Sequence, residues 1–579
     1  MAGAATALWL VAAPAWAQQA ADAVQPESAS GAAERTLAKA ERQMVAAANP
    51  LAAEAGLAIL RDGGNAIDAM VTVQLVLGLV EPQSSGLGGG SFLVYYDAEE
   101  GRLTTFDGRE TAPRDATPQL FQDASGEPLE FYDAVVGGRS VGTPGTLKLM
   151  AETHARYGQL AWRRVVQPAI ELAEKGFEVS PRLHDLIVED GERLKTYDGP
   201  SAYFFLDGQP LPVGHLLKNQ AYADTLKAIA TDGAEAFYEG PIAQAIVDTV
   251  HGAGDNPGRL SLADLASYQV VEREPVCVDY REAEVCGMGP PSSGALTVGQ
   301  ILGLIEPYDI GAMGAESAEA WRLIGDASRL AFADRGRYMA DIDFVPMPLK
   351  GLTDKAYIAE RAKLIGGDAA LAEDEVVAGT PPWDHAMLWG DDQALELPCT
   401  SHFSIVDADG NVVSITTTIE NGFGSRLMTN GFLLNNELTD FSFATQEDGR
   451  PVANRVEPGK RPRSSMSPTI VMKDGKPWIA IGSPGGSRII GYVAEALIAL
   501  IDWNMDVQEA VSLPHLVNRF GPFDLEAGTS AEDLAGPLAE AGFETNVTDL
   551  DSGLHGIVIT AGGLEGGADP RREGVAIGD

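Results

Sequence analysis

The segment PCTSHFSIVD (residues 398–407) decides how this chain folds, because a polar group opens directly onto a strand-like run. The run turns at Asp409-Gly410 and returns over residues 411–419, which predicts a β-hairpin with Thr400 at its start. A threonine hydroxyl needs a base before it can act as a nucleophile. If the peptide bond before Thr400 were cut, its own α-amino group, with a reference pKa of about 7.7 to 8.0, would be that base. Taken alone, the segment is better explained as an ordinary hairpin with polar side chains on its exposed face.

The composition is that of a large globular protein. The chain has 579 residues, of which 45% are hydrophobic and 7% aromatic, so it is long enough to bury a sizeable core. Lys and Arg total 41 against 83 Asp and Glu, and the net charge of -42 argues against a nucleic-acid or anionic-membrane partner. A ligand that carries carboxylates would need local cations or aligned N–H donors in its pocket to overcome this field.

The N-terminus has the pattern of an export signal. Residues 1–17 form an apolar run that ends in Ala15-Trp16-Ala17, the small-x-small pattern of a signal-peptidase site, and predict a periplasmic or secreted protein. No Lys or Arg precedes the run, so either the true start lies upstream or this is a short apolar leader. Residues 18–35 have the composition of a flexible tether. No later apolar run is long and unbroken enough to predict a membrane span.

The three cysteines do not have the spacing of a metal site. Cys277 and Cys286 lie in a hairpin-like segment, where they either close a small disulfide in an oxidising compartment or remain two free buried thiols. Cys399 is the odd one of the three.

Hairpins and helices alternate along the chain. Asn49-Pro50 predicts the start of a helix that ends at Gly63-Gly64, and Asn65 predicts the cap of a second, almost wholly apolar helix. Further helices are expected over residues 146–157, 317–338 and 488–501, and four hairpins within 91–107, 277–288, 401–419 and 469–482. Antiparallel hairpins flanked by helices indicate an α+β protein in which helices cover sheets in layers.

Four further segments accompany the Thr400 segment: DGRETAP (107–113), LLNNELTDFS (433–442), KRPRSSMSP (460–468) and GSPGGSRII (482–490). Together the five segments resemble the γ-glutamyltranspeptidase family, in the family's order, and the likeness extends from Asn49-Pro50 to ADPRREGVA (568–576). The resemblance implies the four-layer αββα sandwich of N-terminal-nucleophile hydrolases. It also implies self-cleavage between Cys399 and Thr400 into a large subunit (36–399) and a small subunit (400–579) that share one fold.

The resemblance assigns the chemistry to four residues. Thr400 matches the family's nucleophile, and Thr418 matches the threonine that hydrogen-bonds to the nucleophile and orients it. Gly485 and Gly486 match the oxyanion hole, and they lie where a strand gives way to a helix whose first N–H groups are unpaired. Without the family context, threonine is a common strand residue and a glycine pair is usually a tight turn.

The remaining motifs resemble a clamp for the head group of a free amino acid. Arg109, Ser464 and Ser465 match the residues that bind the α-carboxylate, and Glu420, Glu437 and Asp440 those that bind the α-ammonium. Among 83 acidic residues, any one of these carboxylates taken singly fits a solvated surface position equally well. Glu420 stands where several family members carry Asn, and the change keeps hydrogen-bond acceptance while adding negative charge.

The implied activity is that of a self-processing acyltransferase and hydrolase of γ-glutamyl amides such as glutathione. The γ-glutamyl group would pass through an ester on Thr400 to water or to an amino acid or peptide acceptor, and no metal or organic cofactor is implied. The closest alternative is a cephalosporin (glutaryl) acylase on the same scaffold. Glutaryl groups lack the α-ammonium, so the acidic set argues for glutamyl.

Two alternatives come from other classes. Residues 138–142 fit the G-x-S-x-G pattern of serine hydrolases around Ser140, but Pro144 and Gly145 disfavour the helix that must follow such a serine. A secreted binding protein without catalytic activity is the second, and a chain that never cleaves would support it. The glycine-rich stretch 85–90 lacks the spacing and the Lys-Ser or Lys-Thr of a phosphate loop, so we expect it to serve packing.

Overall fold

The structure is a computed structural model that describes residues 34–254, 256–383, 389–392, 394, 396–397 and 399–579. The predicted signal segment 1–17 and all of the predicted tether except residues 34 and 35 lie outside the described residues.

The hairpin that opens at Thr400 lies in the middle of a sheet. Strands β12 (Thr400–Val406) and β13 (Val412–Thr418) pair antiparallel, and every residue of both is buried. Gly410 takes a positive φ of 90° at the turn, which favours glycine. The Asp407 carboxylate accepts hydrogen bonds from the N–H groups of Asp409 (3.0 Å) and Asn411 (2.9 Å) and so fixes the turn.

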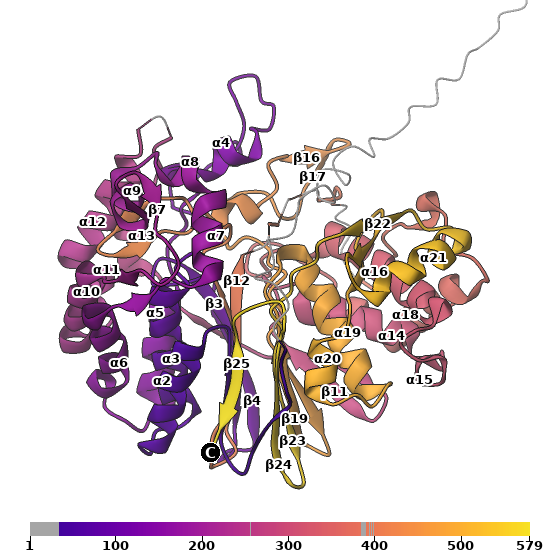
Figure 1. The fold of residues 1–579 in the computed structure, drawn as a ribbon. Coiled ribbons are helices and arrows are strands. Elements are labelled where there is room, and N and C mark those ends of the chain that lie inside the picture. The colour runs from indigo at the N-terminus through magenta and orange to yellow at the C-terminus, as the bar shows by residue number, and fades with distance from the viewer. Residues whose placement is uncertain (1–33, 255, 384–388, 393, 395, 398) are drawn as a thin grey trace, which may run out of the picture.

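Two seven-stranded antiparallel sheets stack in the centre of the molecule (Figure 1). The first has the order β25-β2-β12-β13-β3-β4-β9, with β2 Met44–Ala47, β3 Gly90–Asp97, β4 Arg102–Gly108, β9 Val271–Arg273 and β25 Val575–Gly578. The second has the order β1-β24-β23-β19-β18-β11-β10, with β1 Ala38–Ala40, β10 Val276–Tyr280, β11 Ala283–Gly287, β18 Thr469–Lys473, β19 Lys476–Gly482, β23 His555–Thr560 and β24 Gly563–Ala568. All four predicted hairpins are present as neighbouring strands.

Helices cover the outer face of each sheet (Figure 1). One layer contains α2 Pro50–Arg61, α3 Ala66–Val80, α5 Thr146–Tyr157, α6 Trp162–Lys175 and α10 Gln220–Asp232. The other contains α14 Gly294–Ile305, α16 Ala318–Tyr338, α18 Lys355–Ala362, α19 Ile489–Ile501 and α20 Val507–Val511. Asn49 and Asn65 cap α2 and α3 through their side chains, as the sequence predicts. The four-layer αββα arrangement is therefore confirmed.

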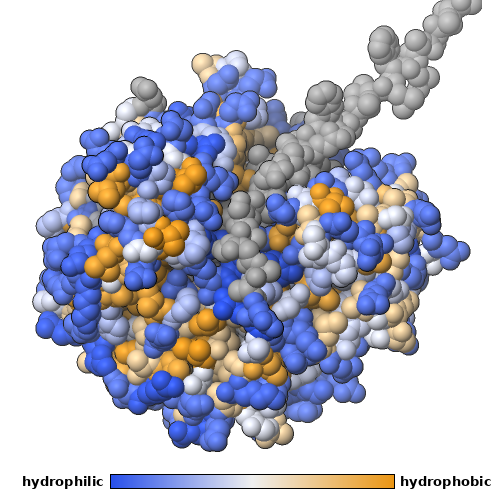
Figure 2. Space-filling view, viewed as in Figure 1, coloured by the Kyte–Doolittle hydropathy of each residue, from blue (hydrophilic) through white to orange (hydrophobic). Residues whose placement is uncertain are grey.

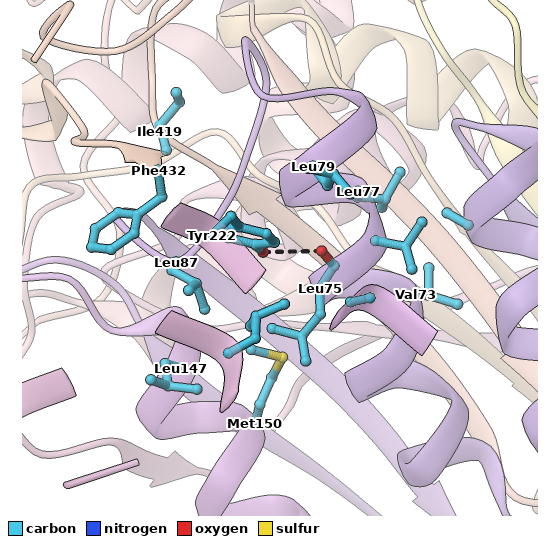
Figure 3. Packing of buried hydrophobic residues seen from close by; sticks show 14 of the residues in the cluster. Val73, Leu75, Leu77, Leu79, Leu87, Leu147, Met150, Tyr222, Ile419 and Phe432 are labelled. Carbon is cyan, nitrogen blue, oxygen red and sulfur yellow. Dashed lines mark hydrogen bonds between the residues drawn. The ribbon is translucent and has the colours of Figure 1, made fainter. Parts of the chain in front are cut away.

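The apolar helix α3 lies at the centre of the largest hydrophobic core, and all of its residues are buried. Figure 3 shows its leucines packed against side chains from other elements, among them Tyr222, whose hydroxyl donates to the Leu75 carbonyl (3.0 Å). A separate core that includes Ala46, Val94 and Ile470 fills the space between the two sheets. Replacement of one of the buried leucines of α3 by alanine typically lowers the free energy of unfolding by about 2 to 5 kcal/mol.

Both sheets combine strands from before and after Thr400. In the first sheet, β25, β12 and β13 come from the part after Thr400. The strand β2, which precedes Thr400, lies between β25 and β12, and β3, which also precedes it, lies next to β13. In the second, β1 lies at one edge and β11 and β10 at the other, with four strands of the C-terminal part between them. The predicted large and small subunits are thus halves of one fold and not separate domains.

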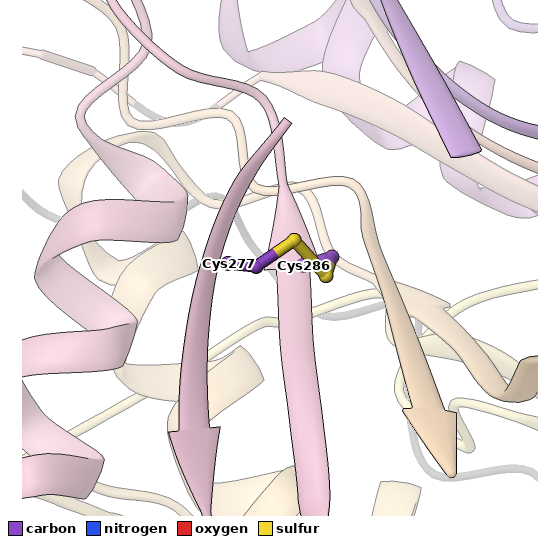
Figure 4. The surroundings of a disulfide bond; sticks show 2 residues. All are labelled: Cys277 and Cys286. Atoms are coloured by element: carbon purple, nitrogen blue, oxygen red, sulfur yellow. A yellow bond between two sulfur atoms is a disulfide. The ribbon is translucent and has the colours of Figure 1, made fainter. Parts of the chain in front are cut away.

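A disulfide joins Cys277 of β10 to Cys286 of β11 (Figure 4). The two residues are direct partners across the strands, with 4.1 Å between their Cα atoms.

On the visible face, hydrophilic residues predominate and hydrophobic ones form scattered groups (Figure 2). Within the described residues, the helices are all too short or too polar to pass through a bilayer.

Candidate active site

Thr400 is buried at the first position of β12, directly opposite the last residue of β13. That residue is Thr418, and the two side-chain oxygens are 3.2 Å apart, with the Thr400 hydroxyl as donor. The antiparallel register therefore places the predicted nucleophile in contact with the threonine predicted to orient it.

The Thr418 hydroxyl also contacts the peptide bond that precedes Thr400. It donates to the carbonyl oxygen of Cys399 at 3.0 Å and accepts from the N–H of Glu420 at 2.8 Å. A hydroxyl that donates to a carbonyl oxygen stabilises negative charge that develops there. Thr418 can therefore polarise the carbonyl group that the Thr400 hydroxyl would attack during self-cleavage.

The glycine pair follows β19 and begins a short helical turn, Gly486–Arg488, that continues into α19. Gly485 and Gly486 have φ values of 133° and 57°, which L side chains rarely adopt. Among the described residues, no backbone carbonyl accepts a hydrogen bond from either N–H group. The pair thus has the conformation and the free donors that an oxyanion hole requires.

A small cavity of about 20 Å³ joins the predicted site residues. It is lined by Arg109, Glu396, Leu397, Thr400, Thr418, Glu420, Glu437, Asp440, Ser464, Ser465, Met466, Gly486 and Ile489. Nine of the ten predicted catalytic and binding residues are among them, and the tenth, Gly485, is the neighbour of Gly486. This volume has room for about one water molecule.

Arg109 is paired with the acidic residues of the site. Its guanidinium group contacts the carboxylates of Glu437 and Asp440 and donates to the carbonyl oxygens of Pro462 (3.3 Å) and Arg463 (2.9 Å). The sequence motifs predict Arg109 at one end of a ligand and the acidic residues at the other. The structure instead places these opposite charges in direct contact.

Four buried carboxyl groups surround this single arginine, and burial raises the pKa of each of them. The pKa of Glu437 is raised, those of Glu110 and Asp440 are raised well above their usual values, and that of Glu420 is raised to about 8. The negative charge of Glu437 adds to the shifts of Glu110 and Glu420. The sequence motifs assign no role to Glu110, although it directly follows Arg109.

Several atoms of this group have no partner. Glu437 Oε2, Asp440 Oδ1 and both carboxyl oxygens of Glu110 are buried and accept no hydrogen bond from an N–H or hydroxyl group, and the Glu110 and Glu437 carboxyls lie within hydrogen-bonding reach of each other. Glu420 has a positive φ of 75°, which is rare for a residue with a side chain and is found at ligand sites. Unpaired buried oxygens and locally strained backbone are expected where a cationic ligand completes the site.

The two serines differ in their contacts. The Ser464 hydroxyl accepts from the N–H of Met466 at 3.1 Å. The Ser465 hydroxyl donates to the Glu396 carboxylate and accepts from Arg335 at 2.7 Å. The sequence motifs assign no role to Glu396, Arg335 or Arg463, although Arg463 lies within KRPRSSMSP (460–468).

The segment before Thr400 lies over the site. Leu397 donates its N–H to Glu420 at 3.2 Å. A Cβ atom on Gly486 would lie 2.6 Å from the carbonyl oxygen of Glu396 and 2.7 Å from that of Leu397. The backbone of Glu396 and Leu397 therefore occupies the space in front of Gly486.

The competing serine lies elsewhere. Ser140 belongs to the 3-10 turn Gly138–Ser140, its side chain is buried, and its hydroxyl donates to the carbonyl of Val135 at 2.7 Å. Its environment is that of a structural turn. Cys399 is buried, and its sulfur lies 3.4 Å from the carbonyl oxygen of Gln83.

Comparison with known sequences gives matches over almost the full chain. The family model described as Gamma-glutamyltranspeptidase matches residues 52–579. The chain is 38% identical over 548 residues to the glutathione hydrolase proenzyme of Bacillus subtilis (strain 168), covering 92% of this chain and 91% of that protein. It is 36% identical over 561 residues to the acylase ACY 1 proenzyme of Pseudomonas sp. (strain V22), covering 95% and 96%.

Solved structures that resemble this chain are also acylases and gamma-glutamyltranspeptidases. A cephalosporin acylase from Bacillus halodurans superposes with a TM-score of 0.81 at 27% identity, covering 96% of this chain and 99% of that one. The Helicobacter pylori gamma-glutamyltranspeptidase gives 0.56 at 34% identity, covering 62% of this chain and 99% of that one. On its sequence motifs, its fold and these matches, the chain belongs to the gamma-glutamyltranspeptidase family.

Proposed function

We propose that this protein cuts its own chain before Thr400 and then transfers γ-glutamyl groups from amides such as glutathione to water or to amino acid and peptide acceptors. The observation that carries the proposal is the cavity where a nucleophile pair, a glycine pair and a group of buried carboxyls around Arg109 meet. Serine hydrolase chemistry at Ser140 lacks comparable support, because that hydroxyl is bonded to a backbone carbonyl.

Self-cleavage would begin with attack of the Thr400 oxygen on the Cys399 carbonyl carbon. The Thr418 hydroxyl, 3.0 Å from the carbonyl oxygen, would stabilise the charge that forms there. Collapse moves the acyl group from the nitrogen of Thr400 to its side-chain oxygen, and water then hydrolyses this ester. The products are a chain that ends at Cys399 and a chain that starts at Thr400. The two seven-stranded sheets, which combine strands from both products, would hold them together.

In the cut enzyme, the free α-amine of Thr400 would take the hydroxyl proton and return it to the leaving amine, since its pKa lies near working pH. Thr400 would attack the γ-carbonyl of the substrate, and the N–H groups of Gly485 and Gly486 would stabilise the oxyanion. The resulting γ-glutamyl ester would then pass to water or to an acceptor amine.

Substrate recognition would separate the present ion pairs. The α-carboxylate would draw the guanidinium of Arg109 and the hydroxyls of Ser464 and Ser465, while the α-ammonium would take the freed carboxylates. An ammonium group would supply the partner that the unpaired Asp440 Oδ1 lacks. This demand for positive charge favours glutamyl over glutaryl substrates.

A glutaryl acylase is the second candidate, because an acylase relative matches the chain over 95% of its length. The matched probes γ-glutamyl-p-nitroanilide and glutaryl-p-nitroanilide differ in the α-ammonium group alone. We expect the glutamyl compound to have the higher kcat/KM by about tenfold or more, the worth of a hydrogen bond to a charged group. Asp440→Asn should reduce this preference, and the reverse preference in the wild type would favour the acylase.

The test of the whole proposal is intact-mass analysis of the purified wild type and of Thr400→Ala, with turnover measured on both samples. We expect two fragments that meet at the Cys399–Thr400 bond in the wild type, and one uncut, inactive chain in the variant. Turnover by a preparation that contains no chain beginning at Thr400 would rule out this chemistry.

We also propose export to an oxidising compartment. The apolar segment 1–17 and its small-x-small ending support a signal peptide, and the bond between Cys277 and Cys286 is of a kind that persists outside the cytosol. N-terminal sequencing of protein from a periplasmic fraction would test this, since a chain that retains Met1 in the cytosol contradicts it.

A further inference from the structure

Strand β10 lies at the edge of the second sheet, where β11 is its single neighbour among the described strands (Figure 4). The Cα atoms of Cys277 and its partner Cys286 are 4.1 Å apart, the short spacing of an antiparallel pair that exchanges no backbone hydrogen bonds. The backbone N–H and C=O groups of Cys277, and by alternation those of Asp279, therefore point away from β11. Within the described residues, no backbone group of another segment is bonded to them.

This outer edge is accessible. Cys277 and Val278 are half-buried, Asp279 is exposed, and all three line a surface cavity of about 790 Å³. The volume lies within the range of about 300 to 1,000 Å³ that is usual for ligand pockets. The cavity also borders α18, the end of α14 and the turn between β18 and β19, and Ile358 and Ala359 of α18 give it an apolar wall.

The edge is only lightly protected against pairing with another chain. Proteins commonly protect an edge strand with proline, with charged side chains or with a covering segment. Here Pro275 directly precedes β10, and Lys355 pairs with Asp279 at 2.7 Å. These two side chains are 82% and 58% exposed, and ion pairs so exposed contribute little stability. Lys355 is therefore free to turn away when a second chain approaches.

The charge around the cavity indicates the kind of chain that fits. Arg281 and Lys355 are its two basic residues, and Arg281 is already paired with Asp502 at 2.9 Å. Against them stand five acidic residues: Asp279, Glu282, Glu284, Glu306 and Asp474. Pairing with a second copy of this chain would bring two such acidic rims together, which is unfavourable. The rim instead suits a partner with positive charge.

We propose that the outer edge of β10 is a docking site for an extended, basic segment of a partner protein, which adds to the second sheet as a further strand. The outward N–H and C=O groups of Cys277 and Asp279 would bond to its backbone, as in other cases of strand addition. The site shares no lining residue with the cavity at Thr400 and does not rest on the proposed function.

The two faces of the sheet determine the pattern of the added strand. Val278 faces α14, because a Cβ atom on Gly299 of that helix would lie 2.5 Å from the Val278 side chain. Asp279 and its cross-strand partner Glu284 lie on the opposite face. Successive side chains of a docked strand would alternate between the apolar wall of α18 and these carboxylates. The preferred partner segment therefore alternates aliphatic and basic residues.

The first test measures the fluorescence anisotropy of the peptide acetyl-KVKVK-amide, carrying a neutral fluorophore, with the purified full chain. We expect saturable binding to the wild type, and at least about tenfold weaker binding of acetyl-EVEVE-amide. Asp279→Pro, which removes an outward N–H group, should bind KVKVK at least about tenfold more weakly than Asp279→Asn, which removes the same charge and keeps that group. Equal affinity of the two variants, or no binding to the wild type at about 1 mM, would overturn the proposal.

A second measurement needs no variant and decides if Asp279→Pro does not fold. Hydrogen exchange of the wild type is followed with and without saturating KVKVK. The amides of Cys277 and Asp279 should exchange at least about tenfold more slowly with the peptide. The control is β22 (Thr545–Thr548), the edge strand of a separate three-stranded sheet, which should not change. Unaltered exchange at Cys277 and Asp279 under conditions where the peptide is bound would overturn the site.

Light scattering distinguishes a partner protein from a second copy. We expect the same monomeric mass for the wild type and Asp279→Asn. A wild-type dimer that Asp279→Pro converts to monomers would show that the edge pairs with its own copy, and would overturn the basic partner.

Discussion

Replacement of Thr418 by valine tests the self-cleavage step, because valine keeps the shape of the side chain and removes its hydroxyl. The change deletes the hydrogen bond to the Cys399 carbonyl (3.0 Å) and the acceptor of the Thr400 hydroxyl (3.2 Å) and of the Glu420 N–H (2.8 Å). Loss of one donor to a developing oxyanion typically costs about 2.7 to 4 kcal/mol, or a hundredfold to a thousandfold in rate. We therefore expect Thr418→Val to cleave itself at least about a hundredfold more slowly than the wild type.

The assay follows the appearance of the chain that begins at Thr400, by denaturing gel and intact mass, from the time of purification. Thr417→Val is the matched control, since the neighbouring threonine has only a 3.4 Å contact with the Gly90 carbonyl. Thr418→Ser should retain most of the rate because it keeps the hydroxyl. Cleavage of Thr418→Val within about threefold of the wild type, with the fold intact by circular dichroism, would refute the assigned role.

Gly486→Ala should slow self-cleavage about tenfold or more, because its methyl group would lie 2.6 Å from the backbone of the segment before the cleavage site at a φ of 57°. Gly475→Ala has a similar φ of 74° without a neighbour within 4 Å, and should cleave normally. The pKa of Glu420 is raised from 4.5 to about 8, so it favours the fold below pH 4.5 and loses this contribution as pH rises to 8. Uncleavable protein should therefore melt at lower temperature at pH 8 than at pH 5, and Glu420→Gln should reduce the difference; an unchanged difference contradicts the shift. Cys277→Ser with Cys286→Ser opens a bond between residues nine apart and should lower the unfolding free energy by at most about 2 to 3 kcal/mol in urea titrations, whereas no change would mean that the bond does not constrain the unfolded chain.

Local sequence patterns predicted the elements of this fold well. The helix expected over residues 146–157 has those bounds, and the one expected to start at 317 uses Ser317 as its cap. These signals depend on residues close together in the sequence, such as caps, turns and alternating apolar positions. The order of strands in the sheets has no local signal, so the resemblance predicted one shared fold but not which strands from before and after Thr400 are neighbours in each sheet.

The site residues were predicted from family motifs, whereas their contacts were not. The motifs identify Arg109 and the acids of 437–440, yet not their direct pairing, which depends on how separate loops meet. Glu396 was missed for a different reason. It lies in no motif, and its contacts are with Arg335 and Arg463, which lie 61 and 67 residues away in the sequence.

The presence of strands from both sides of Thr400 in each seven-stranded sheet bears on the lifetime of the enzyme. In the single chain, an unfolded molecule can refold alone, because all strands of the two seven-stranded sheets belong to one polypeptide. If the proposed cut takes place, unfolding would release two separate polypeptides, and refolding would require a second-order encounter that dilution suppresses. Unfolding of the cut protein would then be effectively irreversible, and its lifetime would be set by its unfolding rate.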